Sequence, residues 1–437
     1  MGKKVFSLIL TGFIFLTVTT LALSQIDNKA MDDLYSQVEL FSYALTTIQS
    51  EYVDEKKPKE LIYGSLKGML SSLDPHSQFL DPDEYEELKT ETQGKFGGLG
   101  IEISIRDGLL TVISPIEDTP AWKAGIKAGD RIVKIEDDLT RDLTLSEAVK
   151  KLRGDPGTKI KITVLREDEF KLLDFTIIRE VIQVQDIKDP QILEDNIGYL
   201  RLTEFREESF NEFRKAIVGL KDKGADSLIV DMRNNPGGLL NIAIKISEEF
   251  LPVGQTIVST KGRRSSQDTV TLSKESPDKI LDWPMVVLIN EGSASGSEIF
   301  AGALKDNKRA VIVGEKSFGK GSVQSVIPLP DGSGLRLTTS KYFTPSGVCI
   351  HGIGIMPDVV VKREERDKKE DEEEKKAKKD VSKIFDDVQV RDAEDPERIK
   401  LTQKEREARD RLLNDNQVQT AMSVLKGIKV YKKLNGG

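Results

Sequence analysis

Apolar segments alternate with amphipathic segments between residues 183 and 361, and this alternation limits the folds open to the chain more than any other feature. SLIVDMR, PMVVLIN and RAVIVGE are apolar at successive positions, which is typical of strands buried on both faces of a sheet. Helical patterns such as SFNEFRKAIVGLKDKG separate them. The alternation predicts an α/β core with a largely parallel sheet, in which ligands bind beyond the carboxyl ends of the strands.

The first 24 residues have the pattern of an export signal. MGKK precedes a long apolar run, and Ala22 and Ser24 are the small residues of a cleavage site. The run is also roughly long enough to span a bilayer, so a retained anchor is the alternative. In both cases the basic end stays in the cytoplasm. We therefore expect an exported protein in the bacterial periplasm or at the extracytoplasmic face of the membrane, with membrane contact only through this segment.

Changes of pattern divide the rest of the chain into further regions. Apolar residues at helical spacing predict a helical N-terminal region, and short β-type runs with one late helix predict a small β-rich domain. The α/β core follows, and a mixed-charge run after it is expected to be a solvated linker. The expected boundaries are 25–95 for the helical region, 96–182 for the β-rich domain, 183–361 for the core, 362–400 for the linker and 401–437 for a helical tail.

A glycine-rich loop, FGGLGIEI, opens the β-rich domain. Its residues Gly97, Gly98, Leu99, Gly100 and Ile101 can turn several backbone N–H groups toward one anion, and the strand that follows would offer a free edge. This combination captures the terminal carboxylate of a peptide and adds the peptide to the sheet. Together with AGIKAGDRIVKIED and TLSEAVKKLRGDPGTKIKITVLR, the loop resembles a PDZ domain. The resemblance implies protein or peptide partners with an exposed C-terminus.

Composition argues against several other classes of protein. The chain has 65 Lys and Arg against 73 Asp and Glu, and beyond the N-terminal lysines it has no isolated basic block, so we expect no nucleic-acid partner. It has no paired-histidine motif, so we expect neither a metal nor a cofactor. The single cysteine, Cys349, lies two residues before His351. We interpret it as a small buried residue and not as a thiol nucleophile.

Three loops that leave the predicted strands carry the candidate catalytic residues, at 231–238, 290–298 and 314–324. In NEGSASGSE a strand ends, small residues turn and a helix begins. Ser295 would then lie at a helix N-terminus, whose amides and positive potential favour a developing oxyanion. Serines also fit turns and helix caps without any catalysis, and the loop alone does not decide between the two interpretations.

A serine nucleophile needs a base. The chain has only two histidines, His76 and His351, so few residues could serve as the base of a histidine triad. Lys320 lies between two glycines and could extend into a pocket, where burial favours the neutral amine that a base requires. Gln324 would share a face with Lys320 on a strand and could orient its amine. The amides of Gly238 and Gly296 would complete an oxyanion hole.

Read together, DMRNNPGGLL, NEGSASGSEIFAGALKD, GEKSFGKGSVQS and LTTSKYFTPSGVCIHGIGIMPD resemble the carboxyl-terminal processing peptidases, also called tail-specific proteases. The resemblance runs from about Tyr35 to about Val361, and NDNQVQTAMSVLKG is similar to the tail of that family. It implies a serine endopeptidase with Ser295 as nucleophile, Lys320 as base, Gln324 in support, and oxyanion donors at Gly238 and Gly296. In the family the residue after the serine is commonly alanine, so Gly296 departs from the pattern and gives a more flexible turn.

The resemblance further implies that the PDZ domain binds the substrate C-terminus and gates the active site. It commonly implies assembly through the helical ends, so a homo-oligomer and a regulatory protein stay among the candidate partners.

Two rival functions were weighed against this one. A nucleotide-binding loop in GEKSFGKG would need serine or threonine after the lysine, where the chain has Gly321. A non-catalytic exported PDZ scaffold on a peptidase-like fold would have no need of Ser295, Lys320 and Gln324 together, and it remains the alternative.

Overall fold

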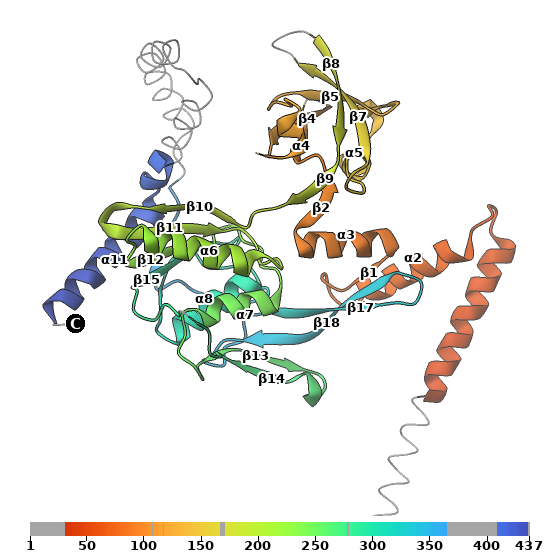
Figure 1. Cartoon of the computed structure of the whole chain (residues 1–437). Helices are drawn as coiled ribbons and strands as arrows, with labels where there is room; N and C mark the ends of the chain where they lie inside the picture. The colour runs from red at the N-terminus through yellow and green to blue at the C-terminus, as the bar shows by residue number, and fades with distance from the viewer. Residues whose placement is uncertain are drawn as a thin grey trace, which may run out of the picture. The chain divides into compact units, whose positions relative to one another are not determined.

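The computed structural model describes residues 31–106, 108–116, 118–166, 171–277, 279–364 and 409–435. The described residues form two compact units, of which the first contains residues 31–81 and 326–337 and the second contains the others. Figure 1 shows the elements of both. The predicted signal segment and most of the predicted linker lie outside the described residues. Among the residues that are described, no helix is both long enough and apolar enough to cross a membrane.

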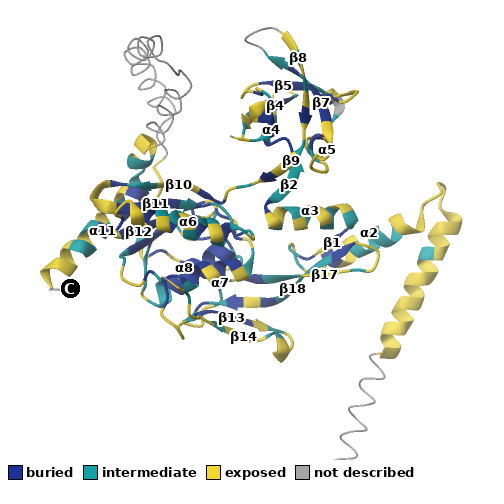
Figure 2. Ribbon diagram, viewed as in Figure 1, coloured by how far each residue is buried: buried dark blue, intermediate teal, exposed yellow. Residues whose placement is uncertain are grey.

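The first unit joins the N-terminal region to the tip of a distant hairpin. It contains a helix over residues 31–51, α2 (Pro58–Ser71) and β1 (Gln78–Leu80). Strand β1 pairs with the first residues of β18 (Gly334–Phe343), so that Phe79 lies opposite Leu335. The helix over 31–51 is almost entirely exposed (Figure 2). Strand β1 lies within the region expected to be helical, because a strand of three residues is too short to show a period and its partner is far away in the sequence.

The PDZ-like domain has its own antiparallel sheet and its own core. Its sheet has the order β3-β4-β5-β7-β8, with β6 paired to β5, and β2 pairs with β9 in a separate ladder. Buried Val112, Ile132 and Ile162 pack with Leu152 of the late helix. The elements of this part of the chain are α3 (Pro82–Gln93), β2 (Lys95–Gly98), β3 (Ile101–Arg106), β4 (Leu109–Pro115), α4 (Pro120–Lys123), β5 (Arg131–Ile135), β6 (Asp138–Leu139), η1 (Thr140–Asp142), α5 (Leu145–Leu152), β7 (Lys159–Arg166), β8 (Lys171–Ile178) and β9 (Glu180–Gln183).

The α/β core is built on a sheet of order β10-β11-β12-β15-β16-β19. Strands β11, β12, β15, β16 and β19 run parallel to one another, and β10 pairs antiparallel with β11 at one edge. The elements are β10 (Ile187–Ile192), η3 (Glu194–Asn196), β11 (Ile197–Leu202), α6 (Ser209–Asp222), β12 (Ser227–Asp231), α7 (Leu240–Glu248), β15 (Met285–Ile289), α8 (Gly296–Asp306), β16 (Val311–Gly314), β19 (Val359–Val360) and α11 (Asn416–Leu434). A second sheet joins β13 (Thr256–Gly262) and β14 (Thr269–Leu272), which flank η4 (Ser265–Gln267), to β18 and β17 (Ser322–Pro328).

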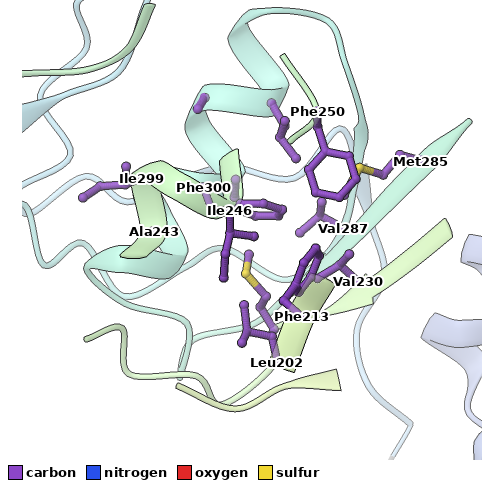
Figure 3. Packing of buried hydrophobic residues seen from close by; sticks show 14 of the residues in the cluster. Leu202, Phe213, Val230, Ala243, Ile246, Phe250, Met285, Val287, Ile299 and Phe300 are labelled. Atoms are coloured by element: carbon purple, nitrogen blue, oxygen red, sulfur yellow. The ribbon is translucent and has the colours of Figure 1, made fainter. Parts of the chain in front are cut away.

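Helices cover both faces of the core sheet, and its central strands β12 and β15 are accordingly buried at every position. Val230 and Val287 belong to the cluster that packs against α6, α7 and α8. Figure 3 shows these valines beside Phe213, Phe250 and Phe300. The rings of Phe213 and Phe250 meet edge to face, with centroids 5.8 Å apart. The alternate residues of the same strands point the other way, into a cluster completed by the C-terminal helix α11.

A buried ion cluster attaches α11 to the end of strand β12. The Arg233 side chain donates to the Asp231 carboxylate through Nε and Nη2, and its Nη1 donates to Asp415 and to Gln417 at 2.8 Å each. Burial lowers the pKa of Arg233, but the hydrogen bond and the charge of Asp231, with the charge of Asp415, outweigh it and hold the pKa above its ordinary value. The Tyr199 hydroxyl also donates to Asp231. The tail is therefore a packed part of the core.

Arg233→Met should destabilise the fold strongly, because it leaves the Asp231 carboxylate buried without its cation. We expect a loss of about 3–5 kcal/mol in the free energy of unfolding, measured by urea denaturation. Lys426→Met is the control, since Lys426 also ties α11 to the core but pairs with Glu194 at the exposed surface. Equal effects of the two variants would contradict the role assigned to the Arg233 cluster.

Candidate active site

The loops that follow β12, β15 and β16 meet at one edge of the parallel sheet, and Asn235 joins the first two. Its side-chain amide donates to the carbonyl of Leu202, and its own carbonyl accepts from the Ala294 amide at 3.0 Å. Asn235 is fully buried. The loop after β12 is therefore held against the loop that carries the candidate serine.

Only one of the three serines in the second loop has a side chain available for chemistry. The Ser293 hydroxyl donates to the Met232 carbonyl at 2.8 Å, and the Ser297 hydroxyl donates to the Asn235 carbonyl at 3.0 Å. Both of these serines are fully buried, whereas Ser295 is half-buried. Ser293 and Ser297 thus have structural roles, whereas Ser295 is the half-buried N-cap residue of α8.

Ser295 has a strained backbone at the start of α8. Its φ of 52° and ψ of −110° are rare for a residue with a side chain. Gly237 packs against this turn so closely that a Cβ there would lie 2.7 Å from the Ser295 Cβ and 2.8 Å from the Gly296 nitrogen. Only a glycine leaves this space, so the neighbouring loop depends on Gly237 to approach the serine.

Glu298, on the first turn of α8, holds the Ser295 loop and the Lys320 loop together. Its Oε2 accepts hydrogen bonds from the amides of Ser295 at 2.9 Å and of Lys320 at 2.8 Å. Its Oε1 accepts from the Ser317 hydroxyl at 2.6 Å and from the Gly319 amide at 2.7 Å. Because Ser295 and Lys320 donate to the same oxygen atom, their amide nitrogens cannot be farther apart than these two short distances combined.

Two amides beside Ser295 are left without an acceptor. Among the hydrogen bonds of the residues that the structure describes, none is donated by the amide of Gly238 or of Gly296. The amide of Ser295 itself is occupied by Glu298, and that of Gly237 by the Asn235 side chain. Unpaired amides at a helix N-terminus are what a developing oxyanion requires.

Gly296 makes room for an aromatic side chain behind this turn. A Cβ at Gly296 would lie 3.1 Å from the ring of Phe205, which is closer than ordinary contact. An alanine at this position would push against the ring, so the departure from the family pattern matches the packing of this chain.

Lys320 is half-buried on the loop between β16 and β17, two residues before the strand that carries Gln324. Its flanking glycines allow close backbone packing: a Cβ at Gly321 would lie 2.1 Å from the His351 nitrogen. Gln324 lies on β17 and donates to the Thr338 hydroxyl at 2.7 Å. Its side-chain carbonyl oxygen is buried and has no hydrogen-bond partner among the described residues, so it is available to accept a hydrogen bond.

The two histidines and the cysteine have no part in this arrangement. The His351 side chain is exposed, and only its backbone packs against the Lys320 loop. His76 belongs to the first unit, where its backbone amide donates a hydrogen bond to the Asp74 carboxylate. Cys349 is half-buried, and not buried as the sequence suggested, because it follows an exposed turn over residues 346–348; its backbone bridges to Phe343.

The predicted carboxylate-binding loop divides between two strands. Gly97 and Gly98 are paired within β2, and Ile101 begins β3, which has a partner on one side only. In the described part of this domain, the amides of Leu99 and Gly100 donate no hydrogen bond, although both carbonyls accept one. Gly100 has a φ of 77°, and a Cβ there would lie 2.3 Å from Thr119. Two unpaired amides therefore precede an open strand edge.

Comparison with known proteins identifies the family of the chain. Residues 196–361 match the family model described as peptidase family S41, and residues 97–177 match a PDZ domain model. A carboxy-terminal-processing protease of Bartonella bacilliformis is 43% identical over 360 residues, which cover 81% of this chain and 82% of that protein. This chain belongs to peptidase family S41. It is a serine-type peptidase with a PDZ domain.

A second relative gives the same family. A carboxyl-terminal-processing protease of Synechocystis is 39% identical over 325 residues, covering 72% of this S41 peptidase and 75% of the relative. Among solved structures, the photosystem II D1 C-terminal processing protease is 29% identical, with a TM-score of 0.44 over 74% of this chain and 86% of that one.

Sequence reasoning missed the residues that hold the site of this S41 peptidase together. Glu298 had a local signal, because a glutamate three residues after a serine at a helix start is typical of a capping box. Asn235 and Phe205 had none, because their partners lie on other loops.

As the pH falls, the peptidase should lose its activity at a higher pH than the one at which it unfolds. Burial raises the pKa of Glu298 above its ordinary value, although hydrogen bonds from Ser317, Gly319, Ser295 and Lys320 oppose the shift. Once protonated, the carboxyl group cannot accept all four hydrogen bonds. A raised pKa means that the folded state binds this proton more tightly than the unfolded state, so protonation of Glu298 favours folding while it loosens the site.

The measurement is kcat/KM on an unstructured protein substrate together with circular dichroism, both as a function of pH. We expect activity to fall as the pH drops through the raised pKa, with the folded signal retained. Glu298→Gln should be weakly active at neutral pH and should lack this acid limb. An acid limb that is unchanged in Glu298→Gln would contradict the assignment.

Proposed function

We propose that this S41 peptidase is an exported endopeptidase that recognises the C-termini of its substrates through the PDZ domain. It would cut peptide bonds with a Ser295–Lys320 dyad supported by Gln324, in C-terminal processing or degradation of proteins. The observation that carries the proposal is the shared acceptor: one Glu298 oxygen binds the amides of both Ser295 and Lys320. The two unpaired amides of Gly238 and Gly296 support it from the other side of the serine.

The proposed mechanism assigns one role to each group. The neutral amine of Lys320 takes the proton from the Ser295 hydroxyl, and the serine oxygen attacks the scissile carbonyl. The amides of Gly238 and Gly296 stabilise the oxyanion of the tetrahedral intermediate. The protonated Lys320 then gives its proton to the leaving amine, and a water molecule, activated in the same way, hydrolyses the acyl-enzyme.

Gln324 fits the task of orienting the lysine. Its side-chain nitrogen donates to the hydroxyls of Thr338 and Ser322, which fixes the amide group, and its buried carbonyl oxygen has no hydrogen-bond partner among the described residues. A buried carbonyl oxygen without a partner costs free energy, so a donor such as the Lys320 amine is expected there.

Substitution of the dyad separates the peptidase from the scaffold alternative. Ser295→Ala and Lys320→Ala should each lower kcat by about 10⁴-fold or more, because each removes the attacking group or its base. Gln324→Ala should cost about tenfold through poorer positioning of the lysine. The assay is cleavage of an unstructured protein with an apolar C-terminus.

Ser297→Ala is the matched control, since it removes a serine from the same loop whose hydroxyl serves only the Asn235 carbonyl. It should keep its activity with a small loss of stability. Cleavage by Ser295→Ala at the wild-type rate, or wild-type binding of the substrate with no cleavage under any condition, would favour the non-catalytic scaffold.

Recognition of a C-terminus is supported by the loop that precedes β3. The amides of Leu99 and Gly100 lack acceptors among the described residues, so they can donate hydrogen bonds to a peptide carboxylate. Strand β3 has a free edge, so the rest of the peptide can pair with it as an added strand.

Amidation of the substrate's C-terminus should weaken its recognition. Replacing the carboxylate by an amide removes charge-assisted hydrogen bonds, so we expect KM or the dissociation constant to rise by about tenfold or more. Binding can be measured by fluorescence anisotropy on Ser295→Ala, with the acid and amide forms of one peptide. Equal affinity for the two forms would show that the loop does not bind a carboxylate.

A further inference from the structure

Phe205 contacts both loops that carry the proposed oxyanion donors. Its amide donates to the Gly237 carbonyl at 2.8 Å, and its carbonyl accepts from the Leu239 amide at 2.7 Å, so its backbone brackets Gly238. Gly238 has a φ of 136°, and a Cβ there would lie 2.3 Å from the Phe205 oxygen. The ring of Phe205 lies against Gly296. Phe205 is fully buried, so a shift of this one residue would move both amides.

The residues on either side of Phe205 are charged and bind each other. Arg206 donates to Glu204 through one guanidinium nitrogen and to Asp186 through another. The Asp186 side chain is 1% exposed and that of Arg206 is 18% exposed, so the pair is shielded from water. The Ser209 hydroxyl also donates to Asp186 and accepts from the Arg206 amide. The backbone around Phe205 is thereby fixed by a mostly buried ion cluster.

This cluster has more negative than positive charge. Asp186 and Glu204 share the one guanidinium, and Glu212 accepts a hydrogen bond from the Asp186 amide. Burial raises the pKa of Asp186 and that of Glu204 above their ordinary values, against the effect of Arg206. Removal of the cation would leave two carboxylates close together with nothing to hold them in place.

The same cluster touches the two strands at which the chain enters and leaves the PDZ domain. Asp186 follows β9, and the Arg206 side chain lies against Gly94, which directly precedes β2. The Val184 amide donates to the Gly94 carbonyl at 2.9 Å, so the two connections are also bonded to each other. A Cβ at Gly94 would lie 2.7 Å from the Arg206 Cδ.

We propose that Arg206 is a positioning residue for the oxyanion hole, acting through Phe205, and that displacement of the β2 and β9 connections reaches the hole through this residue. The inference rests on the proposed function of Gly238 and Gly296. The described contacts of Arg206 are with Asp186, Glu204 and Gly94 and not with Ser295 or Lys320, so its contribution is to the geometry of the two amides.

The test is the rate at which a fluorophosphonate labels the full-length protein. In this reaction the Ser295 oxygen attacks phosphorus, fluoride leaves, Lys320 takes the serine proton, and the phosphoryl oxygen uses the oxyanion hole. We expect Arg206→Met to slow labelling by about tenfold or more, because displaced donors stabilise the transition state poorly. Arg206→Lys should recover part of the rate, since it keeps the charge but not the two-pronged geometry. In peptide cleavage, kcat should fall while KM stays near the wild-type value.

Arg214→Met is the control for loss of an arginine in the core. Arg214 pairs with the nearly buried Glu249 at 3.6 Å, and its replacement should change stability and not the labelling rate. If wild-type protein is labelled and Arg206→Met is labelled within about twofold of the wild-type rate, the inference is wrong. If wild-type protein is not labelled at all, the proposed function itself fails.

Gly94→Ala tests whether a change beside the PDZ domain reaches the oxyanion hole, because it leaves every residue of the peptidase core unsubstituted. The new methyl group would push on Arg206, so labelling should slow. Gly224→Ala introduces the same backbone strain, at a φ of 88° compared with 68° at Gly94, but has no neighbour within 4 Å. It should label at the wild-type rate. Equal labelling rates for the two glycine variants would overturn the coupling between the PDZ connections and the oxyanion hole.

Discussion

The Glu298 carboxylate is the interaction on which the site depends. It is fully buried and accepts four hydrogen bonds, two from backbone amides of the Lys320 loop, one from the Ser317 hydroxyl and one from the Ser295 amide. These donors come from loops after two neighbouring parallel strands, β15 and β16. A carboxylate is the one common side chain that can accept all four bonds at once. Burial of its charge is costly, and the four hydrogen bonds offset that cost only while both loops stay in place.

The strain at Ser295 follows from the same arrangement. A positive φ at a serine costs about 1–3 kcal/mol and persists only where the surroundings enforce it. Glu298 holds the serine amide from the helix side, and Gly237 closes against the turn from the loop after β12. The amide of Gly296 begins the helix and has no acceptor within it, so it is left as a donor beside the strained serine.

Support for the site extends to residues that are far from the chemistry. Phe205 connects the glycine loop to the ion cluster of Asp186 and Arg206, and Arg233 connects the end of β12 to the C-terminal helix. Both clusters are mostly buried and both join segments distant in sequence. The peptidase core therefore includes the tail, which the sequence presented only as a separate helical region after a charged linker.

The sequence by itself determined the elements that local pattern encodes. Apolar runs of three residues in β12 and five in β15 located these strands, and glycine-rich stretches located the loops. The order of the motifs indicated a serine peptidase with a PDZ domain, which the comparisons confirm. It also singled out Ser295, although Ser293 and Ser297 fit the same local pattern. Only the tertiary structure separated these serines, because their different burial depends on Met232 and Asn235 in another loop.

The tertiary structure likewise decided the pairing of β1 with β18 and the roles of Glu298, Phe205 and Arg206. Each of these depends on partners brought close by strand order and helix packing, and such contacts leave no period in the local sequence. A residue's neighbours along the chain set its backbone preference, whereas its hydrogen-bond partners and its burial are set by the fold as a whole.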